Sequence, residues 1–541
     1  MPRRTRDTKS TFATLGDALS DAASQKLLQR RKALEKRAHE LSELQKKHSK
    51  RPPKTNAGKR RQPETFLKAK PPSEPIESLI IRPNYYPSSK DDELRPTRRF
   101  EFWGLPAASP TREEPPKNAT AAQKKKFENY LGCGKWQPHP GELDDLFLWI
   151  GLDLGTSSVK VVVQLPYEAG EPKIAIPAPE FCLSDDHQYL WQSVLWVGAK
   201  DELSAYPITG GRAIQSLKQG ILAAKPGEPV SLGDGSRTTV TRQEAMTAFL
   251  AFVARYVRGW LLTNRPNLFE KRRPVWFLNV GVPTATADEE EVTASYRHAA
   301  SAAFLLSNDD APIDVETVRA FISEAAKSEV DDVSLVPETT AEASTFARSH
   351  TGGRGLYLMV DVGATTLDVC TFRLDTDENK YALIRADVRP LGVEAYYWHL
   401  AQGRNEPDFK HQSSVCMQSV VWDTKHKFSP HADCWKNGEK LPVFLAGGGA
   451  KNSLHRELVQ ALGPWLAEHS NNDGIRQLEL PEPENMEFPI GPCDYTRLAV
   501  AWGLSYPKDE IGTVVMPSEM KEVPRFRAKD FTTRFIDKDM V

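Results

Sequence analysis

The stretch Gly151-Leu-Asp-Leu-Gly-Thr-Ser-Ser158 lies between two densely apolar runs, and it decides the fold. Apolar residues on both sides of a short turn predict a hairpin of two buried strands. Gly155 lets backbone N–H groups approach phosphate oxygens without an intervening Cβ. Thr156 and Ser157 add hydroxyl donors, and Asp153 at the strand end is suited to hold a hydrated Mg²⁺. Taken alone, the motif fits an ordinary glycine-containing hairpin equally well.

A second copy of this pattern, Asp361-Val-Gly-Ala-Thr-Thr-Leu-Asp368, follows 208 positions later (361 − 153). An acid again ends an apolar run and is followed by small residues and hydroxyls. The residues expected to face a phosphate are Gly363, Ala364 and Thr365. Two such loops predict two related half-domains that bind one polyphosphate between them.

A third motif, Phe444-Leu-Ala-Gly-Gly-Gly-Ala-Lys451, precedes a helix that is expected to begin near Ser453. A turn made of Gly447, Gly448 and Gly449 allows the close approach of a planar base, and Lys451 can lie against that base. A lone strand, glycine turn and helix is weak evidence, because any tight turn can use glycines. After two phosphate hairpins in this order, it is strong evidence.

The remaining pattern alternates strands with helices, which indicates an α/β architecture. Apolar spacing predicts the following elements: strands at 193–198, 275–282 and 333–336; helices at 242–262, 287–306 and 340–348; a second hairpin at 357–373; and a strand, glycine turn and helix at 441–462.

Composition excludes several classes of protein. The 541 residues carry 71 Lys and Arg against 72 Asp and Glu, yet the first 70 residues are strongly basic and the remainder is acidic. No apolar run approaches the roughly 18 residues of a membrane span, and no secretory signal is visible, so we expect no membrane association. The 6 cysteines are far apart, which argues against a zinc ribbon or disulfide scaffold and favours a cytoplasmic location.

The pattern divides the chain into three parts. Residues 1–145 are basic, rich in proline and expected to be a largely disordered arm and linker. Within them, 22–50 has leucines spaced for a short coiled-coil helix, although a solvated, partly helical arm fits better at this length. Residues 146–510 are the expected folded domain, and 511–541 are an expected tail.

These motifs, in this order, resemble the actin-like ATPase superfamily, and the closest resemblance is to the nucleotide-binding domain of DnaK-type heat-shock chaperones. Further matching segments are Ser193-Val-Leu-Trp-Val-Gly198, Asn279-Val-Gly-Val-Pro283, Glu338-Thr-Thr-Ala-Glu-Ala343, Leu391-Gly-Val-Glu394 and Leu498-Ala-Val-Ala-Trp-Gly503. The resemblance covers about residues 147–508. It implies a two-lobed actin-like fold of ribonuclease H-like repeats, with lobes at about 146–355 and 356–510, and ATP or ADP with Mg²⁺ in the cleft.

The resemblance also implies roles for single residues. Asp153 and Asp361 would hold Mg²⁺ through water, and Thr366 would neighbour the γ-phosphate. Lys218 resembles the lysine that orients the attacking water, and Glu338 the acid that closes the outer shell of the metal. From the residues alone, Lys218 fits a solvated helix lysine better, and Glu338 fits a capping acid equally well.

Three single-residue departures from the family bear on the chemistry, and a fourth departure, the short stretch after position 510, bears on the function. Ala364, Thr339 and Lys451 stand where the family has glycine, proline and arginine, so we expect ATP binding to survive and hydrolysis to be slow. Too few residues follow position 510 for the chaperone's peptide-binding domain.

We therefore expect a nucleotide-controlled conformational switch that is read by a protein partner. The alternatives are a sugar-type small-molecule kinase, an actin-like filament protein and a nucleotide-binding scaffold without turnover. Nucleic-acid binding by the basic arm 1–70 is less favoured, because no aromatics or reader motif accompany the charge.

Overall fold

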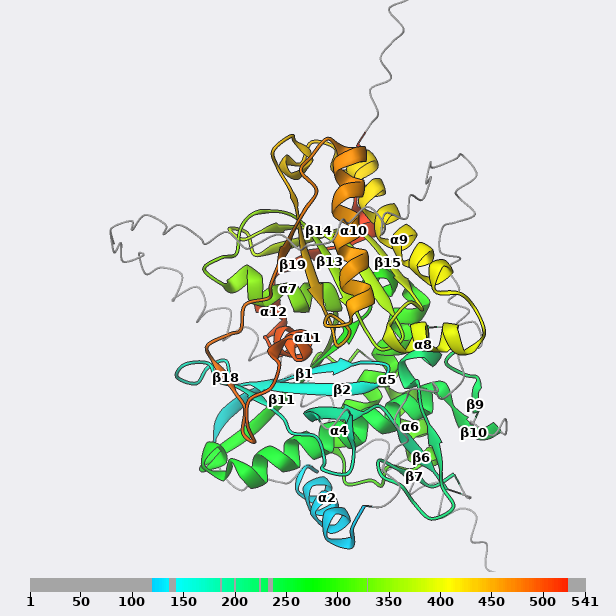
Figure 1. Cartoon of the computed structure of the whole chain (residues 1–541). Helices are drawn as coiled ribbons and strands as arrows, with labels where there is room; N and C mark the ends of the chain where they lie inside the picture. Colours follow the sequence, from blue (N-terminus) through cyan, green and yellow to red (C-terminus); the bar gives the residue numbers. More distant parts are fainter. Residues whose placement is uncertain are drawn as a thin grey trace, which may run out of the picture. The chain divides into compact units, whose positions relative to one another are not determined.

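The computed structural model describes residues 119–135, 143–184, 187–198, 201–222, 225–231, 237–327 and 329–523, all within one compact unit of the chain. The expected helix at 22–50 and the basic arm 1–70 lie outside the described residues. The part described is a mixed α/β structure built on two large sheets (Figure 1).

The first sheet has the order β12-β11-β1-β2-β3-β18, with β5 also pairing with β2, and β4 with β5. Strands β1, β11 and β12 run parallel, and β2 and β3 continue the sheet antiparallel on the other side of β1. The bounds are β1 (Asp144–Leu154), β2 (Ser158–Gln164), β3 (Lys173–Ala175), β4 (Leu183–Ser184), β5 (His187–Gln192), β11 (Arg272–Val282), β12 (Val333–Pro337) and β18 (Met486–Glu487).

The second sheet has the order β17-β16-β13-β14-β15-β19. Strands β13, β16 and β17 run parallel, and β14 and β15 are antiparallel beyond β13. The bounds are β13 (Gly355–Val362), β14 (Leu367–Asp375), β15 (Lys380–Arg389), β16 (Leu441–Ala446), β17 (Ile475–Leu478) and β19 (Thr513–Val515).

The two sheets repeat one topology. In each, a hairpin and a third antiparallel strand are followed by two strands that return to the other side of the first strand and run parallel to it. The hairpins expected from the sequence are therefore the central pairs of their sheets, β1–β2 and β13–β14. Strand β1 is almost wholly buried, as its unbroken apolar run requires.

Helices α7 (Glu338–Arg348) and α11 (Ala499–Leu504) pack together between the two sheets (Figure 1). One core cluster combines residues of both sheets, such as Val162 and Phe444, with Ala341 of α7 and Ala501 of α11. The helices approach so closely that a Cβ at Gly503 would lie 1.9 Å from the carbonyl oxygen of Ala341. The contact between the halves of the domain is thus built on a small-residue helix crossing.

A helical layer covers the outer face of the first sheet. It contains α4 (Arg242–Asn264), α5 (Glu290–Asn308) and α6 (Val315–Ala325). Helix α4 is long and apolar enough to cross a membrane by length and composition alone, but 94% of its apolar window is buried inside the protein. Its apolar character is therefore explained by its position in the first hydrophobic core.

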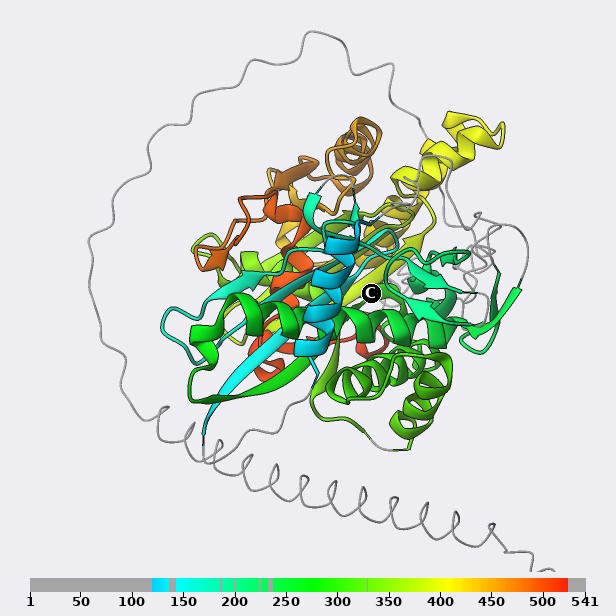
Figure 2. The same cartoon turned by 90° about the horizontal axis from the view of Figure 1, so that it is seen from below.

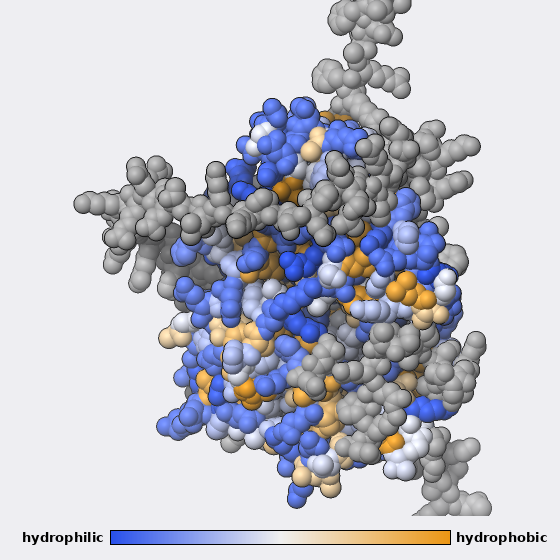
Figure 3. Space-filling model, in the orientation of Figure 1, coloured by the Kyte–Doolittle hydropathy of each residue, from blue (hydrophilic) through white to orange (hydrophobic). Residues whose placement is uncertain are grey.

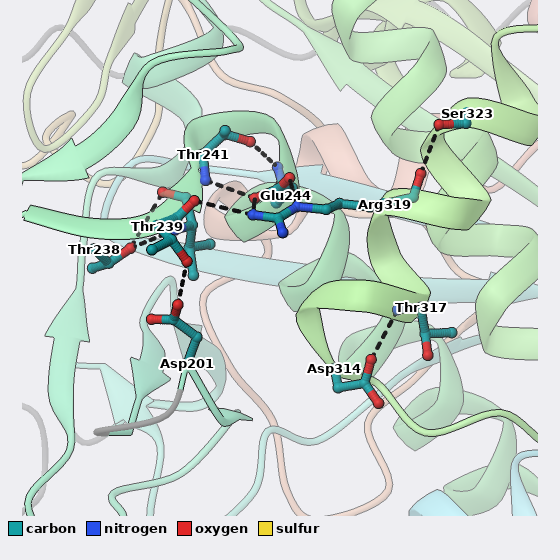
Figure 4. A network of polar contacts seen from close by, with 10 residues as sticks. Asp201, Thr238, Thr239, Thr241, Glu244, Asp314, Thr317, Arg319 and Ser323 are labelled. Carbon is teal, nitrogen blue, oxygen red and sulfur yellow. Dashed lines mark hydrogen bonds and ion pairs between the residues drawn. The ribbon is translucent and has the colours of Figure 1, made fainter.

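A network of polar contacts fixes the start of α4 (Figure 4). Thr241 and Glu244 form a reciprocal capping box, with Thr241 N donating to Glu244 Oε2 at 2.8 Å. Arg319 of α6 donates through Nε to the other Glu244 oxygen, Oε1, at 2.6 Å. Thr239 contacts both Asp201 and, through its carbonyl oxygen, Arg319. The network ties α4, α6 and the β9–β10 hairpin (Pro229–Ser231 and Arg237–Thr241) together.

The remaining elements are smaller or lie on the second half. The short strands β6 (Leu195–Val197), β7 (Leu203–Ser204) and β8 (Arg212–Ile214) form a third sheet, and α3 (Leu217–Leu222) follows it. Helices α9 (Glu406–Asp423) and α10 (Ser453–Ser470) pack on the second sheet to form its own core. Helix α8 (Val393–Ala401) precedes α9, and α12 (Lys508–Ile511) precedes β19.

Three elements lie wholly within ranges that the sequence assigns to the linker and the tail: α2 (Ala121–Cys133), β19 and a short 3₁₀ helix, η8 (Pro517–Glu519). Helix α2 packs on α4 (Figure 2). Phe127 of α2 stacks on Tyr256 of α4 with ring centroids 5.6 Å apart. Strand β19 extends the second sheet beside β15. Helix α2 begins with a capping box of Thr120 and Gln123, which is a local sequence signal, but it buries only three of its residues. Strand β19 is only three residues long and shows no periodicity of its own.

The face drawn in Figure 3 is mostly hydrophilic where it is described, with apolar residues scattered singly or in small groups. Among the described residues, the large apolar side chains that are exposed are Tyr167, Tyr397, Leu400 and Ile490. Tyr397 and Leu400 are three positions apart on α8 and therefore share one face of that helix.

Candidate functional site

A cavity of about 310 Å³ lies where the two hairpins, α7 and the glycine turn after β16 converge. The residues expected from the sequence that line it are Asp153, Gly155, Thr156, Ser157, Lys218, Glu338, Asp361, Gly363, Ala364, Thr366, Gly447, Gly448 and Gly449. Positions up to 296 residues apart (449 − 153) thus meet at one place. Both hairpin turns, at Gly155 and Gly363, face this common cavity.

The first hairpin carries an ion pair next to its turn. In the β1–β2 register Asp153 stands directly opposite Lys160, and Lys160 Nζ lies 3.0 Å from Asp153 Oδ2. The turn closes with Gly155 N donating to the carbonyl oxygen of Ser158 at 3.1 Å. Ser193 Oγ in turn donates to the carbonyl oxygen of Gly155 at 2.8 Å, which fixes the turn from outside the hairpin.

The second hairpin carries two acids in the same positions. Asp361 stands directly opposite Asp368 in the β13–β14 register. The buried Oδ1 atoms of both side chains have no hydrogen-bond partner among the described residues. Burial, followed by the nearby charges of Glu338 and Asp153, raises the pKa of Asp361 to about 7. Burial and the charge of Asp361 likewise raise the pKa of Asp368. This pair lacks the cation that the first hairpin has.

Lys218 and Glu338 form a buried ion pair on the cavity wall. Lys218 Nζ of α3 lies 2.6 Å from Glu338 Oε1, and both residues are less than 9% exposed. Burial lowers the pKa of Lys218, but the charge of Glu338 outweighs it and the pKa lies above its ordinary value. Lys218 is therefore a charged, positioned side chain, and the solvated-lysine interpretation does not describe it. Glu338 is the first residue of α7, two positions before the start of the helix predicted at 340–348, and its side chain is held by Lys218.

The glycine turn after β16 presses against the second hairpin. Gly447 has φ +80°, and a Cβ there would lie 1.9 Å from Asp361 Oδ1 and 2.6 Å from the carbonyl oxygen of Val362. Gly449 N donates to that same carbonyl oxygen at 2.7 Å. Gly447 and Gly449 leave no room for a side chain, because the turn packs closely against Asp361 and Val362 at the edge of the cavity.

Two of the expected residues do not line the cavity. Thr365 is buried behind the turn, where its Oγ1 accepts a hydrogen bond from Gln219 Nε2 at 3.1 Å. Lys451 is 81% exposed at its side chain and pairs with Asp494 at 2.5 Å. The cation that lines the cavity from this side is Arg497 instead. Lys451 is displaced because the helix begins only at Ser453 and the intervening turn directs it to solvent.

Several further charged or aromatic side chains line the cavity and are not among the residues predicted from the sequence: Lys160, Glu342, Asp368, Glu394, Tyr397 and Arg497. The sequence pattern could have identified Lys160 and Asp368, because each lies seven positions after the strand-end aspartate of its hairpin, and the two hairpins have the same length. It could also have identified Glu342, since a residue four positions after Glu338 lies on the same face of the helix. No local sequence pattern identifies Arg497, because it lies in a short helical turn before α11.

The acids in the cavity outnumber its cations. Asp153, Glu338, Glu342, Asp361, Asp368 and Glu394 face Lys160, Lys218 and Arg497. Glu342 is 1% exposed, its Oε1 has no hydrogen-bond partner among the described residues, and burial raises its pKa well above the ordinary value. Among the residues described, no group of three or more His, Cys, Asp or Glu is arranged to hold a metal ion directly.

No protein-family model matches this chain, and no curated protein sequence matches it.

Replacing Gly447 by alanine tests the close contact between the glycine turn and the second hairpin. We expect Gly447→Ala to lower the free energy of unfolding by about 1–3 kcal/mol more than Gly438→Ala, because a Cβ at 447 displaces Asp361 and the backbone behind it. Gly438 is a matched control, since it has φ +84° and open space around it. Urea denaturation of both variants measures the difference, and equal losses would contradict the packing described.

Proposed function

We propose that this protein is an ATP-binding protein of the actin-like superfamily, similar to the nucleotide-binding domain of DnaK-type chaperones. In this proposal it is a slow, Mg²⁺-dependent ATPase that acts as a conformational switch for a protein partner. The proposal rests on one observation above the others: two hairpins of equivalent topology and a glycine turn converge on one cavity, with an aspartate at the end of each first strand.

The residues at the cavity fit a nucleotide. The turns at Gly155 and Gly363 are closed by backbone hydrogen bonds, from Gly155 N to Ser158 O and from Gly363 N to Thr366 O, so their shape is fixed before a ligand arrives. A Cβ at Gly155 would lie 2.6 Å from the carbonyl oxygen of Ser158, which supports a turn that must stay free of side chains. Thr156 and Ser157 supply hydroxyl donors beside it.

They also fit a divalent cation that comes with the nucleotide. The cavity holds more acidic side chains than cations, and a divalent cation that enters with the nucleotide would favour the charged forms of the acids whose pKa is raised, such as Asp361 and Asp368. Asp361 lines the cavity, and its carboxylate can accept a hydrogen bond from a metal-bound water. Asp153 and Asp361 would hold Mg²⁺ in this way, and the bound Mg²⁺–ATP would supply an activated γ-phosphoryl group.

The chain's own residues would position a water for hydrolysis. Lys218 is fixed by Glu338 and carries a positive charge that can orient a water molecule in the cavity. Thr366 lines the cavity at the turn of the second hairpin, where its hydroxyl can donate to a phosphate oxygen. Because phosphoryl transfer depends on positioning and charge, these contacts suffice for slow turnover without a further nucleophile.

A switch needs an element that can change with the ligand. The two sheets are joined by the α7–α11 crossing, and both helices touch the cavity, through Glu338 and Glu342 of α7 and Val500 of α11. A ligand that bridges both hairpins would favour the arrangement in which they lie close together. A partner protein could then bind one arrangement more tightly than the other.

The test is binding of ATP and ADP to the full chain by calorimetry, with and without Mg²⁺, followed by phosphate release. We expect binding that is tighter with Mg²⁺ and slow release of phosphate. Absence of binding heat at high protein concentration contradicts the proposal. Binding without phosphate release would instead support a scaffold without turnover. Capture of a partner in ATP but not in ADP, or the reverse, would support the switch.

A small-molecule kinase is the second candidate, and one observation favours it. Such an enzyme needs an acid that can accept the proton of a substrate hydroxyl, and Glu342 is a buried, unpartnered acid on the cavity wall with a raised pKa. The two candidates are separated by measuring ADP formation with sugars and polyols present. Stimulation by one of these compounds, together with its phosphorylated product, would favour the kinase.

A further inference from the structure

A lysine is completely buried where the first sheet meets α11. Lys173 lies on β3, directly opposite Gln164 of β2, and neither side chain is exposed. Its Nζ lies 2.8 Å from Gln164 Oε1, 2.7 Å from Ser505 Oγ and 3.3 Å from the carbonyl oxygen of Trp502. All three partners are uncharged, so in the described part of the chain no carboxylate is hydrogen-bonded to this amine.

The hydrogen bonds around Lys173 can be completed in either protonation state. An ammonium group donates three hydrogen bonds, whereas a neutral amine donates two and accepts one. Gln164 Oε1 and the carbonyl oxygen of Trp502 can only accept, but the hydroxyl of Ser505 can donate or accept. When it accepts from Lys173, it can donate to the carbonyl oxygen of Trp502, which is 2.7 Å away. The surroundings therefore admit both the charged and the neutral lysine.

The charges around Lys173 favour the neutral form. Burial is the largest effect, and it lowers the pKa of the amine well below its ordinary value. The positive charge of Arg348, the last residue of α7, lowers this pKa further, whereas Glu510 of α12 and Glu171, which precedes β3, raise it. Burial and Arg348 together outweigh the two acids. The folded protein therefore favours the neutral amine more than the unfolded chain does.

The ring of Tyr506, which follows α11, connects Lys173 with the end of α7. Its centroid lies 3.2 Å from Lys173 Nζ and 3.9 Å from Arg348 Cζ. Two cationic groups this close to one centroid have no room on the same face of the ring, so they lie on opposite faces. Ring faces attract cations, which keeps the charged form of Lys173 accessible. Strand β3, the end of α7 and the chain after α11 thus meet at one aromatic ring.

We propose that Lys173 is a proton-responsive contact between α11 and the first sheet: the neutral amine holds the end of α11 in place, and uptake of a proton loosens it. The effect reaches beyond α11, because α11 packs on α7 and this pair joins the two sheets. Asn279 of β11 holds the same end at every pH, since its Nδ2 donates to the carbonyl oxygens of Leu504 and Tyr506, both at 2.7 Å. Protonation is therefore expected to loosen this end without unfolding the domain. The inference is independent of nucleotide binding.

Because of Lys173, the stability of the protein should rise with pH. The ordinary pKa of a lysine is about 10.4, and that of the folded Lys173 is lower. Between the two values the unfolded chain holds a proton that the folded protein has released, so the free energy of unfolding increases with pH. Below the folded value both states hold the proton, and the cost of burying the charge is fully present.

The first experiment compares urea denaturation of the full chain with that of Lys173→Met from about pH 6 to about pH 10. We expect the ratio of folded to unfolded protein to rise with pH more steeply in the full chain, by up to about tenfold per pH unit, which is the effect of one proton. Lys225→Met is the matched control, because Lys225 is 58% exposed and its loss should leave the slope unchanged. The same pH dependence in the full chain and in Lys173→Met would overturn the proposal.

Two further variants test the proposal if Lys173→Met does not fold. Arg348→Gln removes a charge that opposes protonation of Lys173, and Glu510→Gln removes a charge that favours it. Neither of the two substituted residues is buried, so both variants should fold. The measurement is hydrogen exchange of the amides of residues 499–506, corrected for the intrinsic effect of pH.

In the full chain we expect this exchange to become faster as the pH falls. The pH at which it accelerates should move up in Arg348→Gln, because the pKa of Lys173 rises, and down in Glu510→Gln, because that pKa falls further. Movement of both variants in the same direction would overturn the proposal. Exchange of α11 that is independent of pH in the full chain would overturn it as well.

Discussion

Replacing Gly503 by alanine is expected to destabilise the protein by about 3 kcal/mol or more, because α7 and α11 must move apart. A Cβ at this position would lie 1.9 Å from the carbonyl oxygen of Ala341 and 2.5 Å from its carbonyl carbon. Both are backbone atoms of a buried helix, so neither can move aside as a flexible side chain could. The same crossing joins the two sheets, and the strain would therefore reach both halves of the domain.

Gly132→Ala is the matched control for this variant. Gly132 is also helical, in α2, but it is exposed, and a Cβ added there would have no other atom within 4 Å. Alanine there should be neutral or stabilise the helix by up to about 1 kcal/mol. Urea denaturation of both variants gives the free energies of unfolding. A Gly503→Ala variant as stable as Gly132→Ala would show that the helix crossing is looser than described.

Asp361→Asn is expected to lower ATP turnover by about a hundredfold or more, if the proposed function is correct. The substitution keeps the size and position of the side chain but removes the charge that would act on a metal-bound water, and losses of this size are usual for one electrostatic contact in a catalytic cavity. The fold should be kept, because Asp361 faces another acid, Asp368, and loses a repulsion when it is neutralised. Phosphate release under saturating Mg²⁺–ATP is the measurement.

The control for this second variant is Asp433→Asn, a neutralised aspartate whose side chain is 85% exposed and lies outside the residues that line the cavity. Its turnover should equal that of the unchanged protein. Normal turnover by Asp361→Asn would remove the metal assignment from Asp361. A variant that is inactive because it is unfolded is recognised by its thermal denaturation curve.

Much of the fold was predictable where the signal is local. The hairpins at 151–158 and 361–368, the long helix α4 and the strand before Pro283 each follow from apolar periodicity over a few neighbouring residues. Helix α7 begins two residues earlier than expected, at Glu338, because Pro337 is tolerated just before a helix. Such elements are specified by their own residues and need little from the rest of the chain.

The candidate site was predictable in part. The glycines and acids of the three motifs line one cavity, because their spacing fixes their place at the ends of strands. Lys451 and Thr365 were misplaced, since the direction of a side chain in a turn depends on the next element and not on the motif itself. Arg497 was missed, because a residue 344 positions from Asp153 (497 − 153) has no local pattern that marks it.

The sequence by itself determined the two hairpins, their strand-end aspartates and the glycine turn, because these depend on the backbone preferences of neighbouring residues. Only the tertiary structure decided that Lys218 is held by Glu338 and that Arg497 lines the cavity in place of Lys451. The physical reason is that charge pairing and burial act between residues that are distant in the chain, and their partners are chosen by the packing of α7 and α11 between the two sheets.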